Sequence, residues 1–160
     1  MTDVPQYVPQ EVCLACQGCC RFTRKDSEWQ PQVTAVDRDR PGGLKASDVD
    51  FKGRVKTESC GKKFKCRFIN EKNNHCGIYP ARPLDCRLYP FLVVAGKEVC
   101  VHLACPFVQE TYDTQGFEEY VAELKKFLTK DAGVETRNAL KELKHDYQDN
   151  RDELVHLFDL

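Results

Sequence analysis

The 160-residue sequence contains no long hydrophobic run. Its longest purely apolar stretch is residues 91–95, far shorter than the roughly 20 residues that a membrane-spanning helix needs. The first residues have neither the basic segment nor the apolar segment of a secretory signal, so we expect a chain that is not exported. Isoleucine occurs only twice, and no phosphate-binding loop, dinucleotide fingerprint or paired-carboxylate motif is present. The sequence therefore offers no membrane span and no small-molecule substrate.

Cysteine, in contrast, is abundant. Ten of the 160 residues are cysteine, and all ten lie before residue 110. In a chain that we expect to be cytoplasmic, reducing conditions favour thiols over disulfides, and clustered thiols are then more often metal ligands. The composition predicts a metal site.

The net charge of −1 is the sum of two unlike halves. Residues 1–109 hold 17 Lys and Arg against 12 Asp and Glu, which gives +5, whereas residues 110–160 hold 7 against 13, which gives −6. Metal-bound cysteines are thiolates, so the basic excess can offset ligand charge. A basic stretch over residues 52–72 offers a competing interpretation, in which this segment binds nucleic acid. We regard this as the weaker reading, because only Phe64 and Phe68 interleave with the basic residues as stacking platforms.

The patterning predicts an α+β chain in three parts. We expect an extended leader over residues 1–12, then a small cysteine-rich, metal-stapled domain over residues 13–109 with short β-hairpins and helical turns. A helical C-terminal extension over residues 110–160 should pack on that domain. Residues 21–58 are polar and irregular, and their pattern gives no clear assignment.

Two hairpins and a short helix are expected within the cysteine-rich part. The first hairpin pairs residues 65–69 with 75–79 across a turn at 70–74. A helix over residues 83–89 follows and should end before Pro90. The second hairpin pairs residues 91–95 with 98–103 around Gly96, where glycine suits a type II′ turn. Alternation along its return strand places Cys100 and His102 on the face away from the apolar side.

The C-terminal part is expected to form an antiparallel helical pair. Apolar residues from Phe117 to Leu128 recur at helical spacing, with Thr114 as N-cap and Gly133 as stop. Residues 140–157 carry leucines and a tyrosine at heptad-like spacing, which predicts the second helix.

The densest motif is the segment from Cys13 to Cys20, which contains cysteines at 13, 16, 19 and 20. Its C-x2-C-x2-C spacing begins like the bacterial ferredoxin run. In extended backbone, Cys19 and Cys20 would project to opposite sides, which indicates two sites or two edges of one larger cluster. Cysteines at 66, 76 and 86 follow at intervals of ten, and Cys100 and Cys105 come later.

Cys86 is expected near the start of the helix over residues 83–89. Free backbone N–H groups and the helix dipole would there favour its thiolate form. Arg82 and Arg87 flank it, and we interpret both as residues that support the bound cofactor from behind the ligands.

The first motif, together with residues 76–90 (CGIYPARPLDCRLYP), resembles the CxxCxxCC, or YkgJ-type, cysteine-cluster family, which is described as zinc- or iron-chelating. The resemblance covers about residues 13–106. It implies metal ligands at Cys13, Cys16, Cys19, Cys20, Cys66, Cys76, Cys86 and Cys105. Some larger relatives are associated with lysine methylation of flagellin and are thought to hold an iron–sulfur cluster in this domain. Cys60 and Cys100 match no clear family position.

Two functions of different classes follow. The leading one is a cytoplasmic metal-binding protein with thiolate-ligated iron–sulfur centres, 4Fe–4S favoured and zinc second, in electron transfer or in support of a reaction on a protein partner. The alternative is a structural zinc module that binds a protein or a nucleic acid. A cysteine-nucleophile enzyme would need a base, and His75 and His102 are the only histidines near cysteines. We expect His102 to be structural. No catalytic residue is identified, so enzymatic activity stays open.

Overall fold

The computed structural model describes residues 4–16 and 18–160, so the first three residues of the expected leader lie outside the described part. Contacts divide the chain into two compact units. The N-terminal unit is Pro9–Cys86, and the C-terminal unit joins residues 4–8 to Arg87–Leu160. The two units reflect which residues contact one another. They do not test the predicted domain bounds at residues 13–109 and 110–160, which stay predictions. No helix of the described residues is long and apolar enough to cross a bilayer.

The chain combines helices and antiparallel sheets, which confirms the α+β class. Up to the unit boundary the elements are α1 (Gln10–Cys16), η1 (Gly18–Cys20), β1 (Arg21–Phe22), α2 (Ala35–Arg38), η2 (Ala46–Asp48), β2 (Thr57–Cys60), β3 (Lys63–Cys66), η3 (Tyr79–Ala81) and α3 (Leu84–Leu88), where η marks a 3₁₀ helix. The later elements are β4 (Phe91–Val94), β5 (Glu98–His102), α4 (Pro106–Thr111), α5 (Gln115–Thr129), η4 (Asp131–Gly133), α6 (Val134–Lys141), η5 (Gln148–Glu153) and β6 (Leu154–Asp159).

The leader is not extended throughout residues 1–12. Helix α1 already begins at Gln10, directly after Pro9. The carbonyl of Pro9 accepts hydrogen bonds from the backbone N–H of Val12 and of Cys13, at 3.1 and 3.0 Å. Proline is tolerated at a helix start because its missing N–H would have no helical partner there.

The sheet of the N-terminal unit has the strand order β1-β3-β2 and is antiparallel. The hairpin predicted over residues 65–79 is confirmed only next to its turn. An antiparallel bridge joins Ile69 to Cys76, and the N–H groups of Asn70 and Gly77 donate to the carbonyls of His75 and Phe68 at 3.0 and 2.8 Å. The first predicted strand does not extend back as expected. Strand β3 ends at Cys66 and pairs with β2, and Gly61, with φ of 61°, lies in the tight turn between them.

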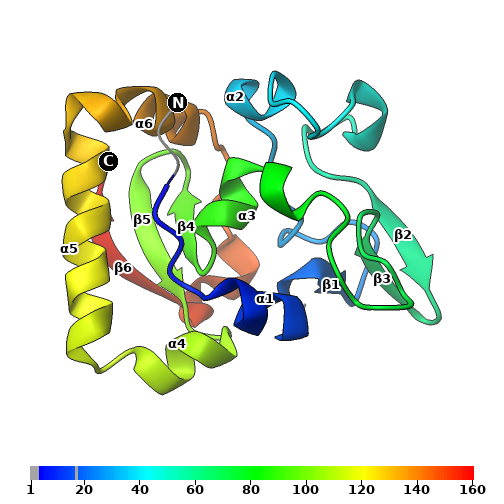
Figure 1. The fold of residues 1–160 in the computed structure, drawn as a ribbon, viewed down its shortest axis with the longest axis horizontal. Coiled ribbons are helices and arrows are strands. Elements are labelled where there is room, and N and C mark those ends of the chain that lie inside the picture. Colours follow the sequence, from blue (N-terminus) through cyan, green and yellow to red (C-terminus); the bar gives the residue numbers. More distant parts are fainter. Residues whose placement is uncertain (1–3, 17) are drawn as a thin grey trace. The chain divides into compact units, whose positions relative to one another are not determined.

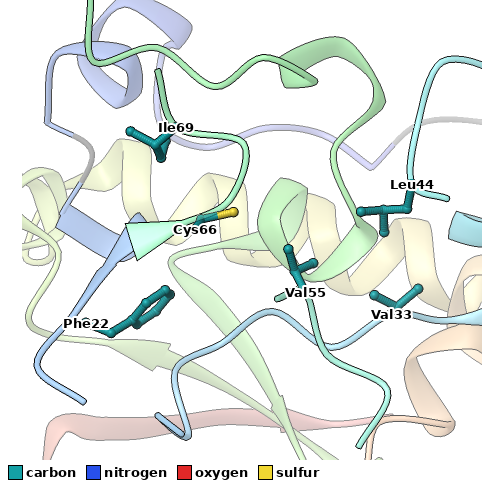
Figure 2. Packing of buried hydrophobic residues seen from close by; sticks show 6 residues of the cluster. All are labelled: Phe22, Val33, Leu44, Val55, Cys66 and Ile69. Atoms are coloured by element: carbon teal, nitrogen blue, oxygen red, sulfur yellow. The ribbon is translucent and has the colours of Figure 1, made fainter. Parts of the chain in front are cut away.

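A hydrophobic core holds the N-terminal unit together, and it draws on the segment over residues 21–58 that the sequence left unassigned. Figure 2 shows its buried members, which are Phe22, Val33, Leu44, Val55, Cys66 and Ile69. A buried arginine fixes the irregular backbone around this core. Arg54 is 6% exposed, binds Asp50 at 3.1 Å and also pairs with Asp26.

The sheet of the C-terminal unit has the order β4-β5-β6, and its first hairpin confirms the prediction. The turn differs from the expected type. Ala95 and Gly96 both have positive φ, 51° and 66°, which is the signature of type I′ rather than II′. A Cβ atom on Gly96 would lie 2.4 Å from the carbonyl oxygen of Lys141. Glycine is therefore required here by close backbone approach as well as by conformation.

Helix α5 covers one face of this sheet, as Figure 1 shows for the yellow helix beside β5 and β6. The Thr114 hydroxyl accepts a hydrogen bond from the N–H of Phe117 at 3.3 Å, which confirms the predicted N-cap. Phe117 and Tyr120 are buried and stack on Phe91 of β4, with ring centroids 5.9 and 4.9 Å away. The helix ends at Thr129, four residues before the predicted stop.

The predicted C-terminal helical pair is wrong in its second member. Helix α6 ends at Lys141, and Tyr147 has φ of 52°, which a continuous helix does not accommodate. Residues 154–159 instead form β6, antiparallel to β5. The heptad-like spacing misled because a β-bulge, which leaves Leu157 without a partner on β5, breaks the strand's alternation of side chains.

Candidate metal centre

Helix α1 carries the first two cysteines of the dense motif. Cys13 and Cys16 are three residues apart, so they lie on one face of the helix. Cys13 is half-buried and Cys16 is exposed. The helix thus brings these two thiols to one side.

The adjacent pair Cys19–Cys20 lies in the 3₁₀ helix η1, not in extended backbone. Their sulfur atoms are 4.0 Å apart. The expectation that the two side chains project to opposite sides is therefore wrong, because the tight helical turn rotates neighbouring side chains toward a common side. Burial and this sulfur contact act on both groups. The contact lowers the pKa of Cys19 and, with burial, raises that of Cys20 well above its usual value.

Three further cysteines come from separate elements of the same unit. Cys66 ends β3 and is 8% exposed within the hydrophobic core. Cys76 forms the single backbone bridge with Ile69. Cys86 lies in the first turn of α3, as predicted.

Helix α3 is anchored by an aspartate that the sequence reading missed. The Asp37 carboxylate accepts a hydrogen bond from the N–H of Leu84 at 2.7 Å, at the start of α3. Its other oxygen accepts one from the N–H of Thr34 at 2.8 Å, at the start of α2. One buried carboxylate therefore caps two helices and fixes the turn that holds Cys86. The Thr34-x-x-Asp37 spacing was the available signal for the α2 cap, and nothing local indicated the second one.

The thiols interact electrostatically, and Cys19 is the common member. A charge on Cys19 acts on the pKa of Cys13, Cys66, Cys76 and Cys86 and raises each of them, in addition to the larger effect of burial. The pKa of Cys66 rises to about 11. Burial thus favours the protonated form of Cys13, Cys66, Cys76 and Cys86. A metal ion would displace the protons and neutralise the thiolates that remain.

Arg82 places a positive charge beside this group. Its guanidinium lies 4.0 Å from the Cys13 sulfur, donates to the Tyr79 carbonyl at 2.9 Å and stacks on the Tyr79 ring at 3.6 Å. The residue is 8% exposed. Its charge lowers the pKa of Cys13, Cys19, Cys76 and Cys86.

A family model named CxxCxxCC and described as "Putative zinc- or iron-chelating domain" matches residues 12–114. The chain belongs to this family. The matched span contains all ten cysteines and ends before α5. No curated protein and no solved structure matches the chain. The family description names both zinc and iron, so it agrees with metal binding and leaves the metal to be argued.

Seven of the eight ligands that the CxxCxxCC resemblance implied lie in the N-terminal unit. The eighth, Cys105, is buried at the N-terminus of α4 in the C-terminal unit. Arg87 lies beside Cys86 on α3 and is 7% exposed. Ligation by these eight cysteines, and the supporting roles of Arg82 and Arg87, stay predictions.

The two cysteines outside the expected ligand set have different surroundings. Cys60 ends β2, and the guanidinium of Arg21 lies 3.6 Å from its sulfur. Cys100 is 3% exposed on β5. The alternation predicted for this strand holds, but the face that carries Cys100 and His102 is buried too, so it is not the open side that we expected.

Half of the basic side chains in the stretch over residues 52–72 form ion pairs within the N-terminal unit. Lys65 is 5% exposed and binds Glu58 at 3.2 Å, and Arg67 binds Asp48 at 3.2 Å. Lys52 pairs with Asp26 at 2.8 Å. With Arg54, described above, four of the eight basic side chains of this stretch pair with carboxylates.

The donor set of this CxxCxxCC chain fits zinc and iron–sulfur centres equally in chemistry, because both favour thiolates. A tetrahedral zinc ion with Zn–S bonds of about 2.3 Å would bring its four thiolates to about 3.8 Å separation. The Cys19–Cys20 sulfur pair lies at 4.0 Å, close to that separation. The donors therefore leave the choice between zinc and iron open.

Proposed function

We propose that the chain is a cytoplasmic metal-binding protein whose cysteine group holds an iron–sulfur cluster, 4Fe–4S favoured. The ligands would be drawn from Cys13, Cys16, Cys19, Cys20, Cys66, Cys76, Cys86 and Cys105. When bound, the cluster would supply one-electron chemistry, either for electron transfer or for a modification reaction on a protein partner. The observation that carries the proposal is the gathering of thiols from α1, η1, β3 and α3 around Cys19 and Arg82.

The sequence spacing of the first cysteines supports an iron–sulfur cluster. Cys13, Cys16 and Cys19 follow the C-x2-C-x2-C spacing with which the bacterial ferredoxin run begins. Such spacing lets one short segment supply three thiolates to different iron atoms of one cluster.

The environment of the thiols supports a redox centre in a second way. The buried guanidinium of Arg82 adds positive charge beside the sulfurs, and a cation next to a cluster favours its reduced state. Burial around Cys66 and Cys86 limits solvent access. Charge, hydrogen bonding and exposure are the properties by which a protein sets the potential of an iron–sulfur centre.

A structural zinc module is the second candidate. It is favoured by Cys66, which belongs to the hydrophobic core shown in Figure 2. A closed thiolate site at that position would stabilise the unit without doing chemistry. Its partner would be a protein rather than a nucleic acid, because half of the basic stretch is already paired internally.

Anaerobic purification of the full chain, followed by iron, zinc and acid-labile sulfide analysis, tests the proposal. We expect about stoichiometric sulfide with iron and a brown absorption that bleaches with dithionite. Cys19→Ser should lose most of that iron, whereas Cys60→Ser, a matched thiol outside the group, should keep it. A colourless, folded protein with stoichiometric zinc and no sulfide would overturn the iron–sulfur assignment and establish the zinc module.

A further inference from the structure

The C-terminal unit carries a second group of metal-ligating side chains, separate from the eight cysteines discussed above. Glu98 on β5 and His156 and Asp159 on β6 offer one nitrogen and two carboxylate oxygens that all lie within 4.8 Å of one another. These three residues are 37%, 51% and 76% exposed, so an ion can reach them from solvent. The arrangement mixes donors that zinc and its neighbours accept.

The strand register explains why these side chains share one face. Glu98 pairs with Asp159 and Cys100 pairs with His156, while Leu157 is left over at a β-bulge. In a regular strand, residues 156 and 159 would point to opposite faces, because they are three positions apart. The bulge inserts one residue and returns both to the face of Glu98. Bulges are known to redirect side chains at functional sites.

Solvent can complete the coordination of an ion on this face, because zinc sites with three protein ligands keep a fourth position for water. Cys100 is two residues from Glu98 on β5 and is 3% exposed, but its sulfur is not one of the atoms that lie within 4.8 Å of one another. A buried free cysteine behaves as a small apolar side chain. The candidate ligands are therefore the three exposed side chains.

We propose that Glu98, His156 and Asp159 form a mononuclear site for a divalent cation of the zinc class. They bind the ion through two carboxylate oxygens and one imidazole nitrogen, and water takes the fourth position. Binding replaces two existing contacts, the hydrogen bond of His156 to Asp159 at 2.8 Å and the ion pair of Arg151 with Glu98 at 3.2 Å. Arg151 thus competes with the cation for Glu98. This site is independent of the proposed cysteine cluster.

Cobalt(II) is the probe, because its absorption reports coordination geometry. The full chain, purified anaerobically with its cluster metal in place, is titrated with Co²⁺, and bound cobalt is counted by elemental analysis. We expect one Co²⁺ per chain beyond the cluster metal. Because loss even of a group that supports a ligand weakens metal binding by about 10–100-fold, His156→Gln should weaken this binding at least that much. Cys100→Ser should leave this binding unchanged.

Two further variants keep the test decisive. Arg151→Gln frees Glu98 and should tighten Co²⁺ binding about two- to fivefold, the equivalent of an exposed ion pair. Asp152→Asn, a neighbouring exposed acid outside the group, should change nothing. His156 is exposed, so its replacement leaves folding intact and the result readable. Binding in His156→Gln equal to that of the unaltered protein, or no cobalt beyond the cluster metal, overturns the proposal. Cys19→Ser should retain this site, which separates the outcome from that of the cluster.

Discussion

Replacing Arg82 tests whether a buried cation supports the cysteine group. The substitution Arg82→Gln removes the charge that lowers the pKa of Cys13, Cys19, Cys76 and Cys86. Those pKa values then rise, protons compete more strongly with metal, and the pH at which half of the sites are loaded moves upward. Loss of a group that supports ligands costs about 10–100-fold in metal affinity, and we expect this range.

The same substitution should also destabilise the fold. A desolvated cation–π contact contributes about 2 kcal/mol, and a hydrogen bond from a charged donor contributes about 1.5–3 kcal/mol. Arg82 makes both with Tyr79. Contributions of contacts on one side chain overlap, so we expect the free energy of unfolding to fall by about 2–4 kcal/mol. Denaturant unfolding of the metal-free protein measures this directly.

Arg82→Lys is the matched control, because it retains the charge and gives up the planar stacking. It should lose stability nearly as Arg82→Gln does, yet hold metal more tightly at neutral pH. Competition with a chelator across a pH series measures the affinities. The reasoning would be refuted by equal metal affinity in the Lys and Gln variants, since charge would then have no part in supporting the thiolates.

Two predictions concern the C-terminal unit. Burial lowers the pKa of His102, so the folded protein favours the neutral imidazole. The free energy of unfolding should therefore be highest above the unfolded pKa of about 6.5 and fall as the pH drops below it. Unfolding midpoints measured between pH 5 and 8 should depend less steeply on pH in His102→Gln than in the unaltered protein, and equal slopes would contradict this. Gly96→Ala should destabilise the protein by about 1–3 kcal/mol in thermal unfolding, because its new methyl group meets a backbone oxygen. Gly42→Ala, also at positive φ but with nothing within 4 Å, should cost less, and equal losses would mean that conformation alone decides.

The sequence predicted elements whose signals are local. Helix α5 has a cap at Thr114 and a stripe of buried residues, and the β4–β5 hairpin has two apolar strands around Gly96. Strand β6 was missed because it forms only where β5, more than 50 residues earlier, offers an edge. The segment over residues 21–58 was missed because Arg54 and its acidic partners, rather than a periodic pattern, define its path.

The candidate site shows the same division. The family resemblance implied Cys13, Cys19 and Cys86 as ligands, and all three residues lie in the N-terminal unit, while their ligation stays a prediction. The geometry of Cys19 was misjudged, because a run of cysteines does not reveal whether its backbone is extended or helical. The double cap by Asp37 was invisible, because residues 37 and 84 are joined only by the fold.

That double cap bears on how the protein acquires its metal. Asp37 ties α3 to α2, and the hydrophobic residues in Figure 2 join both β-strand and loop segments, with no ion taking part. Small zinc fingers, in contrast, have no fold until metal arrives. In this chain the contacts are made by the polypeptide itself, so we expect the N-terminal unit to keep much of its fold when metal is removed. A partner that delivers metal would then meet a folded surface rather than an unfolded chain.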